Sequence, residues 1–406
     1  MIILGLISVE WKKNLAVLTL GMVFASVSYT MIIPFLPLFL LELGATEESV
    51  ALWSGLVFSS TFLVAAIMGP VWGKRADRYG KKKMVLRAGY CLAVVYILGA
   101  LVEDPYHLLG MRILQGFANG FVPAALAIIA TNVPKEKLGF SMGLMQGGLL
   151  VGTIVGPLFG GVLSDLFGMR MSFVVAGVII GAITVLVTFV VKDNSKAEQT
   201  VVTSMREDMR IALTNRRVRD MLVLLFMLQM GGLMLQPIIT LCVDALNQTG
   251  DAFGGTVVAS GLVFSLIGIS GAISAPLWGR YGQKFGYYRV LVLAFAGAGI
   301  VHIIQSQSDS LTMFCMMQAI IGLFIVGVQP ALNAIMVSST DADFHGRVFG
   351  IATTFNQLGC MAGPLGGGVL SGIVGNMAVF ACVGLTHLVT AMVVFCRERS
   401  QILEGK

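Results

Sequence analysis

The chain has 406 residues, of which 56% are hydrophobic and only 12% are charged, and its mean hydropathy is +0.88. Soluble domains carry about a quarter charged residues, so this composition excludes a soluble globular protein. The formal net charge of +6 is compatible with nucleic-acid binding, but the distribution of the basic residues along the chain favours a membrane topology. We therefore expect no nucleic-acid partner.

Apolar runs of about twenty residues or more, separated by short charged clusters, recur along the chain, and each is long enough to cross a bilayer as a helix. The first run is too long for the apolar core of a signal peptide, so we expect no cleaved leader. The predicted fold class is an all-α integral membrane protein with twelve transmembrane helices in two pseudo-symmetric six-helix bundles. The predicted spans are 14–40, 51–72, 84–102, 107–131, 139–163, 170–191, 219–243, 255–279, 288–306, 311–336, 347–371 and 376–396.

Nearly all of the 27 Lys and Arg residues fall on one side of this topology. The exceptions are Arg170, on the opposite side, and Arg112, inside a span. An excess of basic residues marks the cytoplasmic side of a membrane protein. We therefore expect a multi-pass protein in a lipid bilayer with both termini in the cytoplasm.

The two halves of the chain resemble each other. An offset of 206 residues relates Pro70 to Pro276 and Arg112 to Gln318, and the Gly-Pro pair of the fifth span recurs in the eleventh. Such a duplication predicts a substrate site between the halves, near the middle of the bilayer. The predicted domains are an N-terminal six-helix bundle (1–191), a cytoplasmic linker with one short amphipathic helix (192–218) and a C-terminal six-helix bundle (219–406).

The loop after the second span reads Gly73-Lys-Arg-Ala-Asp77-Arg78-Tyr-Gly80-Lys81-Lys82-Lys83. It resembles the signature loop of the major facilitator superfamily, G-x-x-x-D-R-x-G-[RK]-[RK]-[RK]. Its glycines permit a tight turn and close helix approach, and its acidic residue can pair with an arginine or lie at a helix N-terminus. The resemblance implies a gating loop that holds the cytoplasmic ends of the halves together; a plain basic anchor is the alternative. The gating residues would be Gly73, Asp77, Arg78, Gly80 and Lys82.

The fourth span contains Arg112-Ile-Leu-Gln115-Gly116-Phe-Ala-Asn119-Gly120, in which Arg112, Gln115 and Asn119 share one helical face. An arginine inside hydrocarbon costs about 3 kcal/mol or more, so it is expected to face the bundle interior, although snorkelling to the membrane surface is the alternative. The run resembles the R-x-x-Q-G motif of the superfamily. That resemblance implies a role for Arg112 in proton coupling.

The fifth span carries glycines at four-residue intervals, which place them on one stripe where another helix can approach closely. The stripe resembles the antiporter motif of drug:proton antiporters, G-x3-G-x3-G-P-x2-G-G, and generic glycine packing is the alternative. Together with segments such as Ile33-Pro-Phe-Leu-Pro-Leu, it makes the chain resemble bacterial multidrug resistance exporters of the drug:proton antiporter-1 family. The motif residues are Gly148, Gly152, Gly156, Pro157, Gly160 and Gly161.

Spans 1, 4, 7 and 10 line the central cavity in that family, so the resemblance makes their polar side chains, with others in spans 5 and 11, candidates for the substrate site. Abundant Met and Phe, 23 and 24 residues, suit a pocket for varied hydrophobic molecules. A hydrogen bond between helices is the alternative role for each polar candidate. The candidates are Tyr29, Gln115, Asn119, Gln146, Gln229, Gln236, Gln329, Asn333, Asn356 and Gln357; Gln229 with Gln236, and Gln329 with Asn333, are each expected to share a helical face.

No Asp or Glu lies in the middle of a predicted span. The nearest carboxylates are Asp77 and Asp244, and with Arg112 they are the candidates for proton coupling, although the pattern leaves the residue that carries the proton open. His302 and His387, in spans 9 and 12, are expected to be packed and neutral.

The six cysteines are scattered singly, so we expect no disulfide framework, metal or cofactor. No His-Glu-x-x-His cluster occurs, which argues against an intramembrane enzyme. The resulting hypothesis is a monomeric secondary active transporter of the bacterial cytoplasmic (inner) membrane. It would export amphipathic drugs or related small molecules by proton antiport with alternating access, and so contribute to antibiotic resistance. The alternative is a specific facilitator-type carrier of a sugar or other small metabolite.

Overall fold

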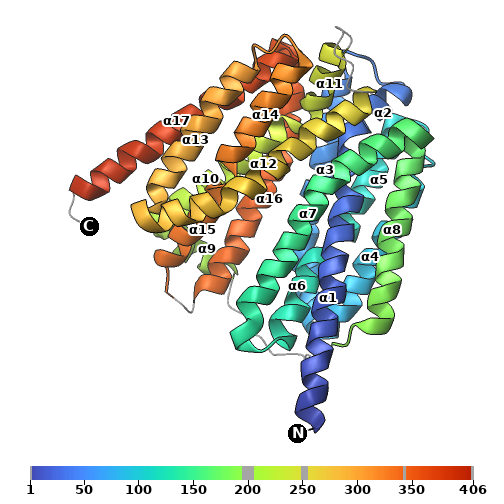
Figure 1. Cartoon of the computed structure of the whole chain (residues 1–406), viewed down its shortest axis with the longest axis vertical. Coiled ribbons are helices and arrows are strands. Elements are labelled where there is room, and N and C mark those ends of the chain that lie inside the picture. Colours follow the sequence, from blue (N-terminus) through green and yellow to red (C-terminus); the bar gives the residue numbers. More distant parts are fainter. Residues whose placement is uncertain (1, 194–204, 248–254, 342–343, 404–406) are drawn as a thin grey trace. The chain divides into compact units, whose positions relative to one another are not determined.

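The computed structural model of the chain describes residues 2–193, 205–247, 255–341 and 344–403. Within these ranges the side chains of residues 2–9, 77, 135, 205–206, 345–346 and 398–403 are not described. The described residues form helices joined by short connections, without a strand among them (Figure 1). They divide into two compact units, residues 1–44 with 63–200 and residues 45–62 with 201–406. The predicted domain boundaries at 191 and 218 stay a prediction.

In the first unit, the long helix α1 packs against α7 and α8 (Figure 1). Phe35, Phe39 and Phe173 form an aromatic cluster at one end, with the Phe35 and Phe173 ring centroids 5.7 Å apart in an edge-to-face arrangement. The elements are α1 (Ile2–Thr30), η1 (Ile33–Phe35), α2 (Leu36–Glu42), the later part of α3 (Val50–Tyr79), α4 (Lys81–Gly99), α5 (Pro105–Ala118), α6 (Phe121–Asn132), α7 (Lys135–Phe167) and α8 (Met169–Val190).

In the second unit, α10 packs against α16, and α13 packs against α17 (Figure 1). The early part of α3, residues 50–62, belongs to this unit, where the Ser59 hydroxyl donates to the Met361 carbonyl of α16 at 2.6 Å. The further elements are α9 (Met205–Thr214), α10 (Arg216–Met234), α11 (Gln236–Asn247), α12 (Thr256–Phe285), α13 (Tyr287–Gln305), α14 (Leu311–Ile325), α15 (Val328–Ser338), α16 (His345–Val374) and α17 (Asn376–Leu403).

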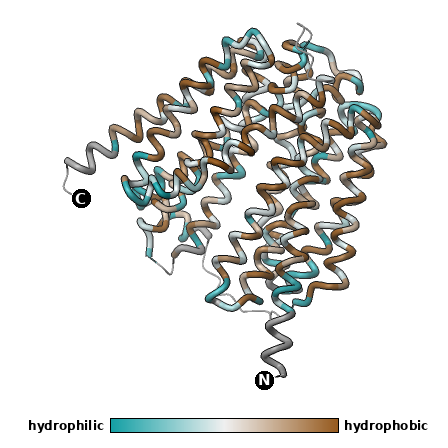
Figure 2. Tube along the Cα trace, viewed as in Figure 1, coloured by the Kyte–Doolittle hydropathy of each residue, from teal (hydrophilic) through white to brown (hydrophobic). Residues whose placement is uncertain are grey.

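The predicted fold class of twelve membrane-spanning helices is confirmed. Within the described residues, eleven helical segments are long and apolar enough to cross a bilayer. The one predicted span that does not meet these criteria is the third, 84–102, which corresponds to α4. The first two turns of α4 carry Lys81, Lys82, Lys83 and Arg87 before the apolar stretch begins. Apolar residues follow the lengths of the helices and hydrophilic residues gather near their ends (Figure 2), which is the distribution that a bilayer requires.

Spans 1, 4, 7 and 10 each contain a break between helical elements: after Thr30, after Ala118, after Met234 and after Ile325. Gly120 has φ of +127°, a conformation that side chains disfavour, and Pro34 and Pro237 lie in the first turn of the element that follows the break. These are the spans predicted to line the cavity, and the breaks change which of their residues share a face.

The internal repeat is reproduced in the hydrogen bonds of the two units. In the first unit, the Trp72 indole donates to the Phe117 carbonyl at 2.9 Å. In the second, the Trp278 indole donates to the Leu323 carbonyl at 2.6 Å. Both partners in the second pair lie 206 residues after those in the first. The same offset relates the turn glycines Gly80 and Gly286, with φ of +100° and +96°.

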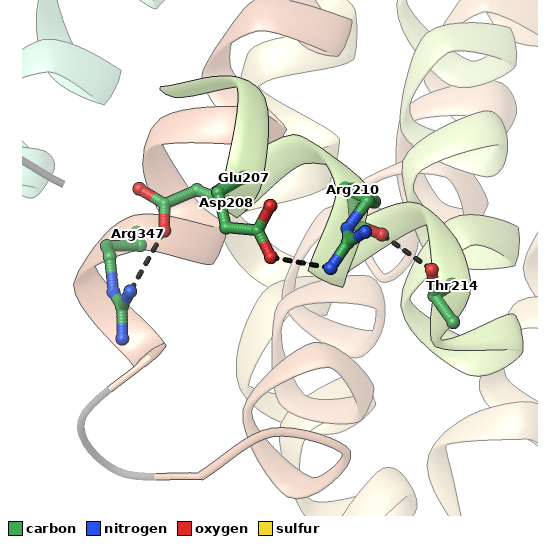
Figure 3. Close-up of polar contacts among 5 residues, drawn as sticks. All are labelled: Glu207, Asp208, Arg210, Thr214 and Arg347. Atoms are coloured by element: carbon green, nitrogen blue, oxygen red, sulfur yellow. Dashed lines mark hydrogen bonds and ion pairs between the residues drawn. The ribbon is translucent and has the colours of Figure 1, made fainter. Parts of the chain in front are cut away.

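The predicted amphipathic helix of the linker is present as α9, which packs against α10 and α16. Arg347, at the start of α16, donates to the buried carboxylate of Asp208 at 2.9 Å (Figure 3). Arg210 pairs with Glu207 one turn away, also at 2.9 Å, and the Thr214 hydroxyl donates to the Arg210 carbonyl (Figure 3). The Arg347–Asp208 pair holds α9 against α16 within the second unit, whereas the other two contacts lie within α9.

Candidate functional site

A buried polar network surrounds Arg112 in the first unit. The Arg112 side chain is only 1% exposed, and its Nη1 donates to Gln115 Oε1 at 3.0 Å. Gln115 Nε2 donates in turn to the hydroxyl of Tyr96 on α4 at 3.0 Å. Tyr29 of α1 lies close enough to interact electrostatically with the guanidinium. This burial contradicts the snorkelling alternative, because a snorkelling arginine leaves its head group at the surface.

The break between α5 and α6 separates Asn119 from this network. Asn119 follows the last residue of α5, and its side-chain oxygen accepts from the Gly120 N–H at 2.7 Å instead of pointing along a continuous helix. The prediction that Asn119 shares a helical face with Arg112 and Gln115 is therefore wrong. A local turn with its own side-chain cap competes with the helix at this position.

Two side chains that the sequence reasoning missed hold the end of α5. Arg87 donates to the carbonyls of Phe117, Ala118 and Asn119 at 3.1–3.2 Å, and its guanidinium stacks over the Trp72 ring, 3.7 Å from the centroid. A cation is favourable at a helix C-terminus, where carbonyls lack helical partners. The sequence did carry signals for both: Trp72 recurs as Trp278 in the repeat, and Arg87 ends the basic cluster at the cytoplasmic start of the predicted span 84–102.

The glycine stripe of α7 packs directly on α1. A Cβ added at Gly152 or Gly156 would lie under 3.0 Å from atoms of α1, and one added at Gly160 would lie under 3.0 Å from backbone atoms of Met31, the residue that follows α1, so a side chain at these positions forces the helices apart. The approach brings the Ser26 hydroxyl within 2.9 Å of the Leu149 carbonyl and the Thr30 hydroxyl within 3.1 Å of the Gly152 carbonyl. The stripe thus joins two helices by backbone contact and by hydrogen bonds across the interface.

The gating loop is described only in part. Gly80 takes the positive φ that a tight turn requires, whereas a Cβ at Gly73 would meet no atom within 4 Å. Arg78 is exposed, and the side chain of Asp77 lies outside the described part of the structure. Lys82 donates from its Nζ to the Thr188 carbonyl near the end of α8 at 2.8 Å.

In the second unit, the structure brings together two of the candidate amides. Gln229 Nε2 of α10 approaches Cys360 Sγ of α16 at 3.8 Å, and this thiol approaches Asn356 Oδ1 at 3.6 Å. Gln236 does not share a helix with Gln229, because α10 ends at Met234 and Gln236 begins α11, where it is buried. That predicted pairing on one face is wrong for the same reason as the one at Asn119.

The remaining candidates have different surroundings. Asp244, on α11, accepts a hydrogen bond from the Thr256 hydroxyl at the start of α12 at 3.0 Å. Gln329 and Asn333 lie on α15 and are partly buried, as is Gln357 on α16, whereas Gln146 on α7 is exposed. Among the described residues, no three His, Cys, Asp or Glu side chains gather in a way that could hold a metal ion. The substrate cavity stays a prediction.

The fold and the buried polar side chains within apolar helices define a multi-pass membrane transporter. The family model of the Major Facilitator Superfamily matches residues 18–249 and 221–403. The chain therefore belongs to the Major Facilitator Superfamily, whose members carry small molecules across membranes.

Named relatives cover nearly the whole chain. A "Multi-drug resistance efflux pump PmrA homolog" of Lactococcus lactis is 29% identical over 399 residues, covering 97% of both chains. A "Multidrug resistance protein MdtG" of Salmonella schwarzengrund is 33% identical over 381 residues, covering 92% of both.

Solved structures show the same fold. A variant of the nucleoside transporter NupG aligns with a TM-score of 0.77 at 14% identity, covering 95% of this chain and 99% of that one. The human organic anion transporter MFSD10 aligns with a TM-score of 0.71 at 17% identity, with the same coverage. At these identities the likeness concerns the fold alone.

Proposed function

We propose that this protein exports amphipathic drugs or related small molecules across the cytoplasmic membrane of a bacterium. The observation that carries the proposal is the resemblance to relatives named as multidrug efflux and resistance proteins, at 29–33% identity over 92% or more of the chain. Proton antiport with alternating access is the mechanism that we propose for this export. The glycine stripe packed on α1 supports it, because that pattern resembles the antiporter motif.

The proposed proton-coupling group centres on Arg112. A buried guanidinium responds strongly to any change of charge near it, because the low dielectric of the interior strengthens electrostatic interactions. In the network of Arg112, Gln115 and Tyr96, a proton or a polar substrate group arriving nearby would reorder the hydrogen bonds. Asp77 and Asp244 remain the proposed carboxylate partners in coupling, and the candidate amides remain the proposed lining of the cavity.

Dye transport into inside-out membrane vesicles tests the proposal. Vesicles containing the wild-type protein should accumulate a fluorescent lipophilic cation when an inward-acid pH gradient is imposed, and should lose it when the gradient is collapsed. Arg112→Ala should reduce gradient-driven accumulation by about tenfold or more, the order expected from removing a buried charged group at a functional site. Arg210→Ala is the matched control, because it removes an exposed arginine paired only with Glu207.

Each outcome has a distinct meaning. No accumulation over a broad panel of dyes would overturn drug export and favour a specific carrier of a sugar or other metabolite. Accumulation that ignores the gradient would overturn proton antiport. Gradient-driven accumulation that persists in Arg112→Ala would support drug export but refute the proposed role of Arg112 in proton coupling.

We also propose that both termini lie in the cytoplasm and that the protein acts as a monomer. The supporting observation is the one-sided distribution of its Lys and Arg residues. A protease-cleavable tag at the C-terminus should be removed from inside-out vesicles and protected in right-side-out ones, and the reverse result would invert the topology. Light scattering of the purified protein should give one chain per particle.

A further inference from the structure

Four buried polar side chains gather in the second unit, in a cluster that the sequence did not reveal. His302 and Gln305 lie on α13, Gln318 on α14 and His387 on α17, and α13 and α17 run side by side (Figure 1). The two imidazole rings have centroids 5.5 Å apart, and their exposed fractions are 4% for His302 and 1% for His387. The expectation of two separate packed histidines thus becomes a histidine pair.

Several polar atoms of this cluster have no hydrogen-bond partner. Gln305 Nε2 donates to Gln318 Oε1 at 2.7 Å, and the Gln305 amide also interacts with the His302 ring. Among the described residues, His302 Nδ1 and both ring nitrogens of His387 have no hydrogen-bond partner. Buried polar atoms are nearly always hydrogen-bonded, so these ring nitrogens are unusual for a membrane helix interior. Each neutral imidazole also keeps one basic nitrogen that can take up a proton.

The surroundings of the pair contribute no charge. Phe295 and Phe380 pack against His387 and His302, with ring centroids 5.5 and 6.3 Å apart. Among the described residues, the only titratable group acting electrostatically on either imidazole is the other one. The other titratable or charged side chains that the structure describes on α10 to α17 are Arg216, Arg217, Arg219, Asp220, Cys242, Asp244, Arg280, Tyr281, Lys284, Tyr287, Tyr288, Arg289, Cys315, Arg347, Cys360, Cys382, Cys396 and Arg397.

A proton bound to this pair would be held reversibly. No carboxylate holds the proton permanently, so the imidazolium can release it again. Two imidazolium charges this close in a low-dielectric interior would repel each other, so the pair accepts one proton at a time. Histidine is also the side chain whose charge ordinarily changes near neutral pH.

The pair is placed to transmit its charge to α10. A Cβ added at Gly231 of α10 would lie 2.9 Å from His387 Nε2, so the imidazole fills the notch that this glycine leaves. Gln229, a candidate for the substrate site, lies two residues earlier on the same helix. A charge gained or lost on His387 therefore acts directly on the backbone of a helix proposed to contact substrate.

We propose that His302 and His387 form the proton-binding site of the second unit. One proton from the water on the outer side adds to a ring nitrogen lone pair, and the resulting imidazolium returns it to the water on the cytoplasmic side during substrate export. The inference rests on the proposed proton antiport. It assigns proton binding within the membrane to these two histidines, because no predicted span has an Asp or Glu near its middle.

Reconstituted protein allows coupling and substrate movement to be measured separately. His302→Gln and His387→Gln should each reduce dye uptake driven by a pH gradient by about tenfold or more, as expected for a functional ionisable residue in the membrane. Exchange of labelled for unlabelled dye, which needs no net proton movement, should stay within about twofold of wild type if folding is intact. His107→Gln is the control, because His107 is exposed and pairs with Asp104 at its own helix start.

Failure of this inference is distinguishable from failure of the proposed function. Wild-type protein that ignores the pH gradient would refute proton antiport itself. Gradient-driven uptake that persists in the double variant His302→Gln/His387→Gln would refute the histidine pair alone. Equal loss of uptake and exchange in folded protein would assign the pair a structural role and also overturn the inference.

A second measurement leaves the cluster intact, in case its variants do not fold. The chain has four histidines, and His107→Gln with His345→Gln leaves only the pair. Nitrogen-15 signals of the two remaining imidazoles should then show one protonation between about pH 5 and about pH 9, at a pH that shifts when dye is added. Two rings that stay neutral throughout this range, with and without dye, would overturn the proposal.

Discussion

Replacing Gly160 with alanine should destabilise the first unit through one added methyl group. The Cβ of an alanine at this position would lie under 3.0 Å from the carbonyl group and Cα of Met31. These are backbone atoms, so no side-chain rotation relieves the overlap. The helices must separate or bend, and the packing of α7 on α1 extends over their shared length.

The magnitude follows from two opposing effects. Overpacking a tight interface costs about 1–3 kcal/mol, and the backbone contact at Gly160 puts it at the upper end of that range. Alanine is better than glycine in a helix by about 1 kcal/mol. The net destabilisation is therefore about 2 kcal/mol, which lowers the melting temperature of a unit of this size by about 4–8 °C.

Thermal unfolding of the detergent-purified protein, followed by the fraction that remains monodisperse, measures this change. Gly147→Ala is the matched control on the same helix, because its Cβ would meet no atom within 4 Å. The control should unfold at the wild-type temperature or slightly above, since only the helix propensity changes. Equal melting temperatures for the two variants would refute the claim that the stripe is a contact surface.

Three further substitutions test the hydrogen bonds described above. Tyr96→Phe should destabilise the protein by about 1 kcal/mol, because it removes the hydroxyl that accepts a hydrogen bond from the Gln115 amide. An unchanged melting temperature would show that this hydrogen bond does not stabilise the protein. Trp278→Phe should cost about 1 kcal/mol, because it removes the indole hydrogen bond to the Leu323 carbonyl near the end of α14 while preserving most of the ring; a neutral result would show that the repeated indole bond does not stabilise the protein. Asp208→Asn should cost about 1 kcal/mol in dilute buffer and less in high salt, since it removes the charge that pairs with Arg347; a salt-independent loss would contradict the ion-pair interpretation.

The sequence by itself determined the number and approximate limits of the spans. A bilayer permits only helices with internally satisfied backbone groups, so apolar length converts directly into transmembrane helices. It also determined the repeat, since Trp72 and Trp278 stand at equal places in the two halves and make equivalent bonds. The glycine stripe could also be recognised from the sequence, because four-residue spacing alone puts small residues on one helix face.

Only the tertiary structure decided which residues of different helices meet. The breaks in the four spans predicted to line the cavity depend on local turns such as Asn119–Gly120, which compete with helix continuation by amounts too small for composition to show. Arg87 finds its three carbonyl partners across a helix pair separated by about thirty residues of chain. His302 and His387 lie on α13 and α17, with three other helices between them in the chain, and helical periodicity carries no information about contact between helices. Their pairing follows from how α13 and α17 pack, and that packing is set by side-chain complementarity along the entire interface.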